Sequence, residues 1–180
     1  MAKFKDIPQF PTSHYEITVP WTSIERELEQ LNQQINGKGG LELNPDYQRC
    51  HVWTKEQQIA YIEYQLQGGE VGRNIIFNSP DWDSSYERMT ELIDGKQRLE
   101  SVRSFLRGDI PAFSFLISEY EDKLRFSDCN FRFRICKLNS RAEVLRLYLN
   151  INAGGTPHTK EEIQRVKDLL NKEINSNEKS

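Results

Sequence analysis

The chain has 180 residues, of which 37% are hydrophobic and 28% are charged, and its formal net charge is −3. This length is enough for one domain with a buried core, and the composition is not that of a disordered chain. The negative charge excludes a uniformly basic nucleic-acid-binding protein but permits a local basic patch. No stretch approaches the roughly 18 apolar residues of a membrane span, and the first residues lack the apolar region typical of a signal peptide, so we expect a cytoplasmic protein outside the membrane. The three cysteines and three histidines are scattered, which indicates a reducing compartment and no zinc site.

The predicted helices are marked by their end residues. The pattern Ser/Thr-x-x-Glu/Gln, in which two side chains satisfy each other's backbone N–H groups, opens four helices, and glycines close several. We expect helices at residues 22–36, 54–68 and 96–108, and two more that begin at Ser140 and Thr159.

The predicted strands lie between these helices, at residues 15–19, 72–78, 86–93, 112–117 and 131–137. Helices and strands alternate without a regular βαβ rhythm, which predicts an α+β fold, a mixed sheet flanked by helices. We expect a single domain at 15–170, with a flexible lead-in at 1–14 and a flexible tail at 171–180.

The segment Ile93-Asp94-Gly95-Lys96-Gln97-Arg98 is the first candidate for a ligand site. It joins a predicted strand to a predicted helix, and such a junction directs backbone N–H groups and the positive end of the helix dipole at an anion. Lys96 and Arg98 add positive charge, and Asp94 can hold a magnesium ion or a ribose hydroxyl. The alternative is an Asp-Gly turn that opens a solvated helix.

Two other segments are candidates for the same kind of ligand. The first contains Tyr47, Gln48, Arg49 and Trp53, which together offer a stacking surface, an amide and a cation and so suit a base, a sugar and a phosphate. The alternative is that Tyr47 and Trp53 are core aromatic residues and that Arg49 pairs with a carboxylate. Gly154 and Gly155 lie in a loop that can form a backbone nest for an anion, or can simply end one helix and start the next.

Basic residues gather between 123 and 146. Within this stretch Arg132 and Arg134 alternate with apolar residues on one strand face, and this face can meet DNA phosphates or simply be solvated. A nuclease pattern, Pro80-Asp81 followed by Asp94-Gly95-Lys96, is rejected. About eight strand residues at about 3.3 Å each separate the two carboxylates by about 26 Å, too far to share one metal ion.

Three segments, NPDYQRCHVW (44–53), LIDGKQRLESVRSFLRGDIP (92–111) and YLNINAGGTPHTKEEI (148–163), resemble the family marked by the D-G-Q-Q-R motif. This family is catalogued as a domain of unknown function and includes the N-terminal regions of GmrSD-type modification-dependent restriction enzymes. It is similar to the ParB/sulfiredoxin-like fold. Each motif alone is weak, but three in the expected order are specific.

The resemblance implies a site that binds or hydrolyses a nucleoside triphosphate with Mg²⁺, in DNA metabolism or in restriction and phage defence. Lys96 replaces the first glutamine of the motif, and a lysine cannot accept a hydrogen bond from an attacking water, so hydrolysis is less certain than binding. The family's positions fall on Asp94, Gly95, Gln97 and Arg98 for its motif, on Tyr47, Gln48 and Arg49 for Y-Q-R, and on Asn152, Gly154 and Gly155 for N-x-G-G.

The leading hypothesis is a ParB-like nucleotide-binding domain with weak magnesium-dependent NTPase activity. Asp94 would hold the metal or water, and Gln97 would orient the γ-phosphate or the nucleophile. The phosphates would be held by Arg49, Lys96 and Arg98. Restriction members carry an additional HNH nuclease region, and this sequence has no His-Asn-His set, so we expect DNA cleavage to need a nuclease or regulatory partner protein. The alternatives are a non-catalytic DNA- or nucleotide-binding regulatory module and a metal-dependent DNA nickase that uses Asp94.

Overall fold

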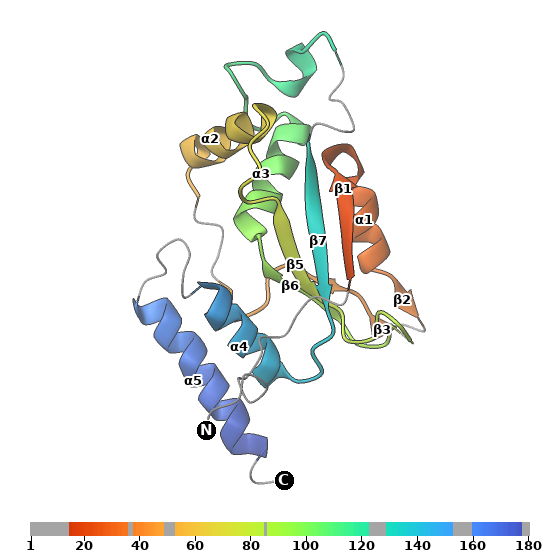
Figure 1. Cartoon of the computed structure of the whole chain (residues 1–180), viewed down its shortest axis with the longest axis vertical. Helices are drawn as coiled ribbons and strands as arrows, with labels where there is room; N and C mark the ends of the chain where they lie inside the picture. The colour runs from red at the N-terminus through yellow and green to blue at the C-terminus, as the bar shows by residue number, and fades with distance from the viewer. Residues whose placement is uncertain are drawn as a thin grey trace, which may run out of the picture.

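The computed structural model describes residues 15–35, 38–48, 53–84, 86–122, 129–152 and 160–177. Its centre is a five-stranded sheet in the order β1-β7-β5-β6-β4, and a separate pair, β2 and β3, forms a small hairpin (Figure 1). The strands are β1 (Tyr15–Pro20), β2 (Gln34–Ile35), β3 (Lys38–Gly39), β4 (Leu41–Glu42), β5 (Asn74–Asn78), β6 (Thr90–Asp94) and β7 (Asn130–Cys136). The helices are α1 (Ile24–Leu31), α2 (Lys55–Leu66), α3 (Lys96–Arg107), α4 (Arg141–Asn152) and α5 (Lys160–Asn177).

The sheet is mixed. β7 lies between β1, to which it is antiparallel, and β5, to which it is parallel; β6 is antiparallel to β5 and parallel to β4. The predicted α+β class with a mixed sheet flanked by helices is therefore confirmed. Among the described residues, no helix combines the length and the apolar character needed to cross a membrane.

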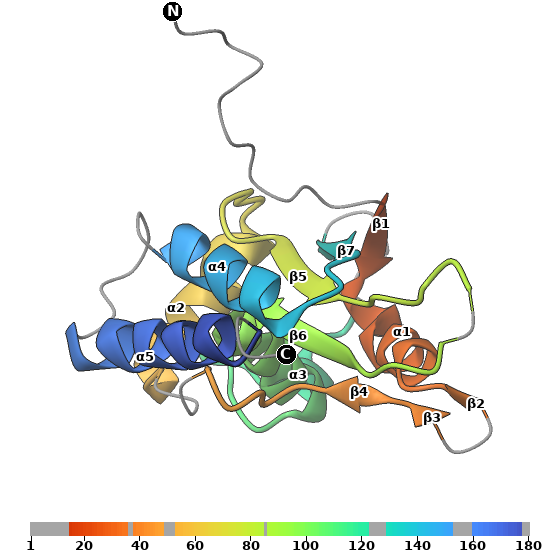
Figure 2. The same ribbon diagram turned by 90° about the horizontal axis from the view of Figure 1, so that it is seen from below.

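Helices pack on both faces of the sheet (Figure 2). Leu92 and Ile93 are adjacent in β6 and both are buried, yet they belong to different clusters of the core. Successive side chains of a strand point to opposite faces, so two layers cover the sheet. Leu92 packs with Phe77 and the residues of α1, α2 and α3, whereas Ile93 packs with Val144 of α4 and Val166 of α5.

The helix starts predicted at Thr54, at residue 96 and at Ser140 are confirmed. The start predicted at Thr22 is wrong, because α1 begins at Ile24 after Ser23, which makes no side-chain capping hydrogen bond, and Thr159 lies outside the described residues. Thr54 and Gln57 form the expected capping box at the start of α2. The first helix is shorter than predicted, 24–31 instead of 22–36, because residues 34–35 pair with 38–39 in the hairpin of β2 and β3. α5 continues to Asn177, past the predicted tail boundary at 171.

Two strand predictions need correction. Residues 112–117 do not form a strand: Ala112 and Phe115 make one isolated bridge around Phe113 and Ser114, whose φ angles of 47° and 70° produce a tight turn. The strand predicted at 86–93 begins only at Thr90. The preceding residues form a loop, in which the backbone N–H of Arg88 donates to the side chain of Asp81 instead of to a neighbouring strand.

Candidate functional site

The junction of β6 and α3 is shaped by Gly95. This residue has φ +102°, and a Cβ atom there would lie 2.5 Å from Cδ1 of Ile75 and 3.3 Å from the carbonyl oxygen of Asn74. Only glycine fits a left-handed conformation this close to a neighbouring strand. The tight turn lets α3 begin at Lys96, directly after Asp94, and it places the positive end of the α3 dipole at the end of the sheet.

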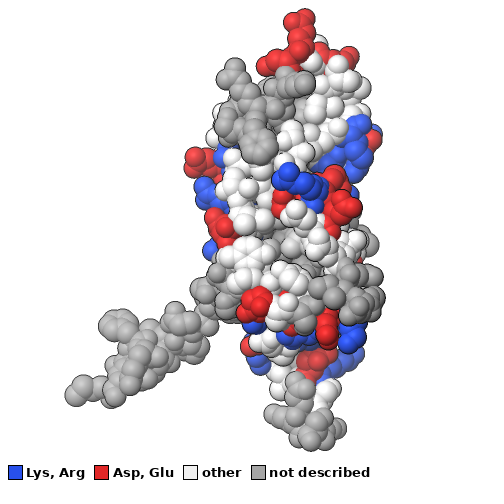
Figure 3. All heavy atoms as spheres, turned by 90° about the vertical axis from the view of Figure 1, so that its right-hand side faces the viewer, with Lys and Arg blue, Asp and Glu red and all other residues white. Residues whose placement is uncertain are grey.

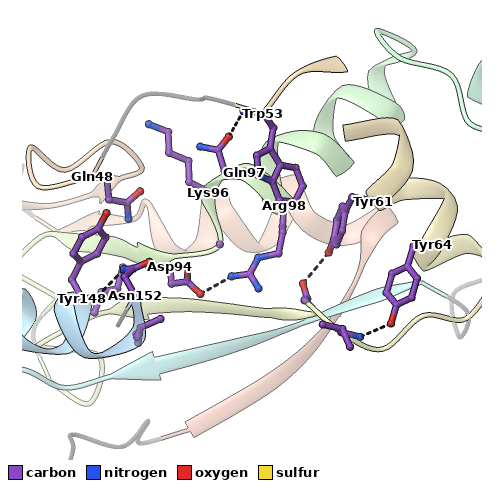
Figure 4. A pocket seen from close by; sticks show the side chains of 15 residues that line it. Gln48, Trp53, Tyr61, Tyr64, Asp94, Lys96, Gln97, Arg98, Tyr148 and Asn152 are labelled. Carbon is purple, nitrogen blue, oxygen red and sulfur yellow. Dashed lines mark hydrogen bonds and ion pairs between the residues drawn. The ribbon is translucent and has the colours of Figure 1, made fainter. Parts of the chain in front are cut away.

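A cavity of about 700 Å³ lies at this junction (Figure 4). It brings together residues from all three sequence segments that we predicted to bind a ligand: Gln48, residues 94–98 and Asn152. These segments are far apart in the sequence. The other lining residues are Trp53, Tyr61, Tyr64, Val71, Gly72, Ile93, Tyr148 and Ile151.

The centre of the cavity carries charge. Nη2 of Arg98 lies 2.5 Å from Oδ2 of Asp94, and these side chains are 19% and 27% exposed, respectively. The aliphatic part of the Arg98 side chain passes close to Gly72: a Cβ atom added to Gly72 would lie 3.2 Å from Cδ of Arg98. Lys96 adds a second cation to the lining. This region is suited to an anion, since two basic side chains meet the N-terminus of a helix there.

Aromatic rings form one end of the cavity, on the side of α2. The rings of Trp53 and Tyr61 meet edge to face, with centroids 5.5 Å apart. The hydroxyl of Tyr61 donates to the carbonyl oxygen of Gly72 at 2.9 Å, and burial raises the pKa of Tyr61, so this hydroxyl stays protonated at neutral pH. The hydroxyl of Tyr64 accepts from the backbone N–H of Val71 at 3.3 Å. Rings held in this way can stack on a nucleobase.

Two amides and a tyrosine form the opposite end, next to α4. Nε2 of Gln48 donates to the carbonyl oxygen of Leu92, and Nδ2 of Asn152 donates to the carbonyl oxygen of Tyr148 at 2.7 Å. Arg165 of α5 donates to the backbone carbonyl oxygens of Tyr47 and Gln48, at 3.2 Å and 3.4 Å. The strand β6 and the helix α5 thus fix the segment that presents Gln48.

Tyr47 lies beneath the cavity and does not line it. Its side chain is 1% exposed, its ring packs on that of Tyr148 with centroids 5.2 Å apart, and its hydroxyl donates to Oε2 of Glu91 at 2.9 Å. In this arrangement Tyr47 supports the lining residue Tyr148 from below and is not itself part of the lining. The predicted ligand-binding residues Arg49, Gly154 and Gly155 lie outside the described residues.

Residues 28–137 match the family described as GmrSD restriction endonuclease, N-terminal domain. This match covers more than half of the chain. The chain belongs to this family. No curated protein and no solved structure gives a match to it. The kinship with the ParB/sulfiredoxin-like fold stays a prediction.

The region that matches the GmrSD N-terminal domain contains only part of the cavity. Gln48, Trp53 and residues 94–98 lie inside it, whereas Tyr148 and Asn152 come from α4, beyond its last matched residue. The aromatic lining on α2 was absent from the predicted site. Tyr61 and Tyr64 are three residues apart in a helix that follows Trp53, so they lie on one side of that helix. This spacing is the feature of the sequence that could have indicated an aromatic lining.

Asp94 could hold a magnesium ion only together with a bound ligand that supplies further oxygen atoms to the metal. Among the described residues, no group of three or more His, Cys, Asp and Glu side chains could hold a metal. Magnesium often takes one or two carboxylates together with substrate phosphates and waters, and Asp94 beside an anion site fits that pattern. Asp81, the other carboxylate of the rejected nuclease pattern, is bound instead by Arg88, with Nε 2.8 Å from Oδ1.

The predicted DNA-binding residues lie on β7 in this GmrSD-type domain. Their alternation with buried Phe131 and Phe133 is confirmed: Arg132 is exposed and Arg134 is partly buried. Nε of Arg134 lies 3.2 Å from Oε2 of Glu16 on β1. On the face shown in Figure 3, the described basic and acidic side chains are interspersed. DNA binding by Arg132 and Arg134 therefore stays a prediction.

Proposed function

We propose that this domain binds a nucleoside triphosphate in the cavity at the start of α3 and hydrolyses it slowly with magnesium, within a restriction or phage-defence system. The main support for the proposal is that Gln48, residues 94–98 and Asn152 line the same cavity. Three separate segments with ligand-binding chemistry are brought together there by the fold. Membership in the GmrSD restriction endonuclease N-terminal family supports the defence context.

Each part of the cavity has a role in this proposal. Lys96, Arg98 and the N-terminus of α3 hold the phosphates. Asp94 would hold magnesium, which on binding would neutralise phosphate charge. Oε1 of Gln97 accepts from the backbone N–H of Trp53 at 3.1 Å, so the amide nitrogen is the group suited to a phosphate oxygen. The aromatic end next to α2 is suited to the base.

The test is calorimetric titration of the purified chain with ATP, GTP, CTP and UTP in magnesium, with phosphate release measured in parallel. We expect micromolar or tighter binding of at least one nucleotide and slow release of phosphate. Lys96→Ala and Arg98→Ala should each weaken binding by about tenfold, since each removes a charged hydrogen bond to phosphate. If the double variant keeps the full affinity, the proposal is wrong.

Arg107→Ala is the matched control for these variants. Arg107 is in the last turn of the same helix, is half exposed, and pairs with Asp109 at 2.9 Å. Its removal takes one positive charge from α3 without touching the cavity, so nucleotide affinity should stay the same.

A second candidate function is nucleotide sensing without turnover. The motif's first glutamine is Lys96 here, a donor only, and Oε1 of Gln97 already accepts from Trp53. Asp94 is paired with Arg98. Few acceptors are thus positioned to orient an attacking water, and this favours binding alone. Saturable binding with no phosphate release would support the sensor, with DNA or a nuclease partner as the next molecules to titrate.

A further inference from the structure

The ion pair between Asp94 and Arg98 opposes the binding of an anion to the cavity that contains it. Of the described residues that line the cavity, Asp94 carries the only carboxylate. Its Oδ2 lies 2.5 Å from Nη2 of Arg98, one of the two cations suited to phosphate. Figure 4 shows this pair in the middle of the cavity, between the aromatic end and the Gln48 end. An approaching polyphosphate therefore meets a guanidinium that is already neutralised, next to a like charge.

Both residues of the pair are held by neighbouring parts of the fold. Arg98 is confined where its stem passes the backbone of Gly72, since a Cβ atom there would lie 3.2 Å from Cδ of Arg98 and 3.3 Å from Cε2 of Tyr61. Asp94 is held at the end of β6, where it pairs with Ile76 of β5. Because the carboxylate of Asp94 is the group that neutralises Arg98, a second positive charge beside Asp94 is the simplest way to weaken the pair.

A divalent cation supplies that charge. Magnesium alone would find one carboxylate that is already paired, and this is a poor site for an ion that dehydrates reluctantly. A polyphosphate alone would meet the charge of Asp94. When both arrive, Asp94 would hold the cation, which would supply positive charge to the phosphates, and Arg98 would be available to bind the phosphates. The cation would thus favour binding of the polyphosphate, and the polyphosphate would favour binding of the cation.

We propose that the Asp94–Arg98 ion pair makes polyphosphate binding and divalent-cation binding interdependent, so that the ligand of this cavity is a metal–polyphosphate complex. The inference rests on the proposed function, because it concerns how the same cavity selects its ligand. Thermodynamic linkage requires the effect to be reciprocal: the factor by which the cation tightens phosphate binding is the factor by which phosphate tightens cation binding.

The variant Asp94→Asn provides the test, because it removes the charge and keeps the shape. Calorimetric titrations would use inorganic tripolyphosphate and ATP, each with EDTA and with excess magnesium, at one fixed ionic strength. The wild type should bind both probes at least tenfold more tightly in magnesium. Asp94→Asn should bind them about tenfold more tightly than the wild type in EDTA, equivalent to about 1.4 kcal/mol, and should gain little from magnesium.

Asp109→Asn is the matched control. It removes the same charge from an arginine partner on the same helix, but the pair of Arg107 and Asp109 is exposed and lies outside the cavity. This control should bind as the wild type does in both buffers. Asp94→Ala provides a second way to remove the charge if the asparagine variant unfolds, and circular dichroism melting curves report the folding of every variant.

The possible results separate this inference from the proposed function. If the wild type binds nucleotide equally well with and without magnesium, and Asp94→Asn binds no better in EDTA, the coupling is wrong and the nucleotide site stands. If Asp94→Asn loses affinity in EDTA, Asp94 assists the anion and the coupling is also wrong. If no nucleotide and no tripolyphosphate binds in either buffer, both proposals fail.

Discussion

The backbone N–H of Trp53 donates to Oε1 of Gln97 at 3.1 Å. This hydrogen bond joins the residues that precede α2 to the first turn of α3, across 44 positions of sequence. It holds Trp53 over the start of α3, with Tyr61 packed against the indole. One side chain of the motif therefore positions the aromatic side of the cavity in addition to lining the cavity itself.

Replacing Gln97 with alanine should loosen this connection. Loss of one hydrogen bond, worth about 1 kcal/mol, should speed hydrogen exchange at the Trp53 amide by about fivefold. Mass spectrometry with peptide-level exchange can measure this. Gln164→Ala is a control, because Gln164 is an exposed glutamine that bonds Asp168 on α5. An unchanged exchange rate at Trp53 in Gln97→Ala would contradict the assigned positioning role.

Gly95→Ala should destabilise the fold and abolish ligand binding. The new Cβ atom would lie 2.5 Å from Cδ1 of Ile75 at a left-handed φ, and strain plus overpacking should cost about 3 kcal/mol. Gly108 at the other end of α3 is a close control: its φ is +79°, but nothing lies within 4 Å of its Cβ position, so Gly108→Ala should cost only about 1 kcal/mol. Urea unfolding distinguishes the two. Equal costs would show that crowding at Ile75 does not matter.

Local sequence patterns predicted the parts of the fold that depend on neighbouring residues. Thr54 and Gln57 signal the start of α2 because the two side chains of a capping box satisfy each other's backbone. The alternation around Arg132 predicted β7 because period two is sufficient to define a strand face. The same logic failed at Phe113, where alternating aromatic residues resemble a strand but the backbone makes a tight turn. β4 has only two residues, too few to show any period.

The candidate site was predicted only in part, because residue chemistry does not reveal orientation. The side chain of Tyr47 has the right chemistry to stack on a base, yet its hydroxyl turns inward to Glu91. Tyr61 and Tyr64 lie in a helix whose pattern signals only a buried face, which Ile62 supplies. Only the docking of α2 beside α3 shows that the tyrosines face a cavity.

Glu91 should make the stability of the domain depend on pH. Burial raises its pKa above the ordinary value of 4.5, although the hydroxyl of Tyr47 and the positive charge of Arg141 oppose this. The folded state therefore holds this proton at a pH where the unfolded state has released it. Stability contributed by the protonated form is fully present below pH 4.5 and is lost as the pH rises through the folded pKa.

Glu91→Gln should remove this pH dependence. The amide stays neutral, and its carbonyl oxygen can still accept from Tyr47, so the variant should be more stable than the wild type at pH 7 and equally stable near pH 4. Urea midpoints between pH 4 and pH 7.5 measure the effect. Glu87→Gln is the control, since Glu87 is 51% exposed and pairs with Lys38 on the surface. If the wild type instead becomes more stable relative to Glu91→Gln as the pH rises from 4 to 7.5, the sign of the effect is reversed and the raised pKa of Glu91 is contradicted.

Asp81 should support a loop and have no part in metal binding. Its carboxylate accepts the backbone N–H of Arg88 at 2.9 Å and Nε of the same residue at 2.8 Å, and these hydrogen bonds lower the pKa of Asp81 below 3.8. Its stabilising contribution is present above pH 3.8 and is lost as the pH falls through the depressed pKa.

Asp81→Asn should therefore lower stability at pH 7 by about 1 kcal/mol, through the weakened hydrogen bonds to Arg88, and should leave nucleotide affinity and its magnesium dependence unchanged. Urea unfolding and the calorimetric titrations above measure both quantities on one preparation. The contrast with Asp94→Asn is informative because the two variants make the same chemical change. If Asp81→Asn also abolished the effect of magnesium, Asp81 and Asp94 would have to act on one metal ion. The binding of Asp81 by Arg88 would then have to break on ligand binding.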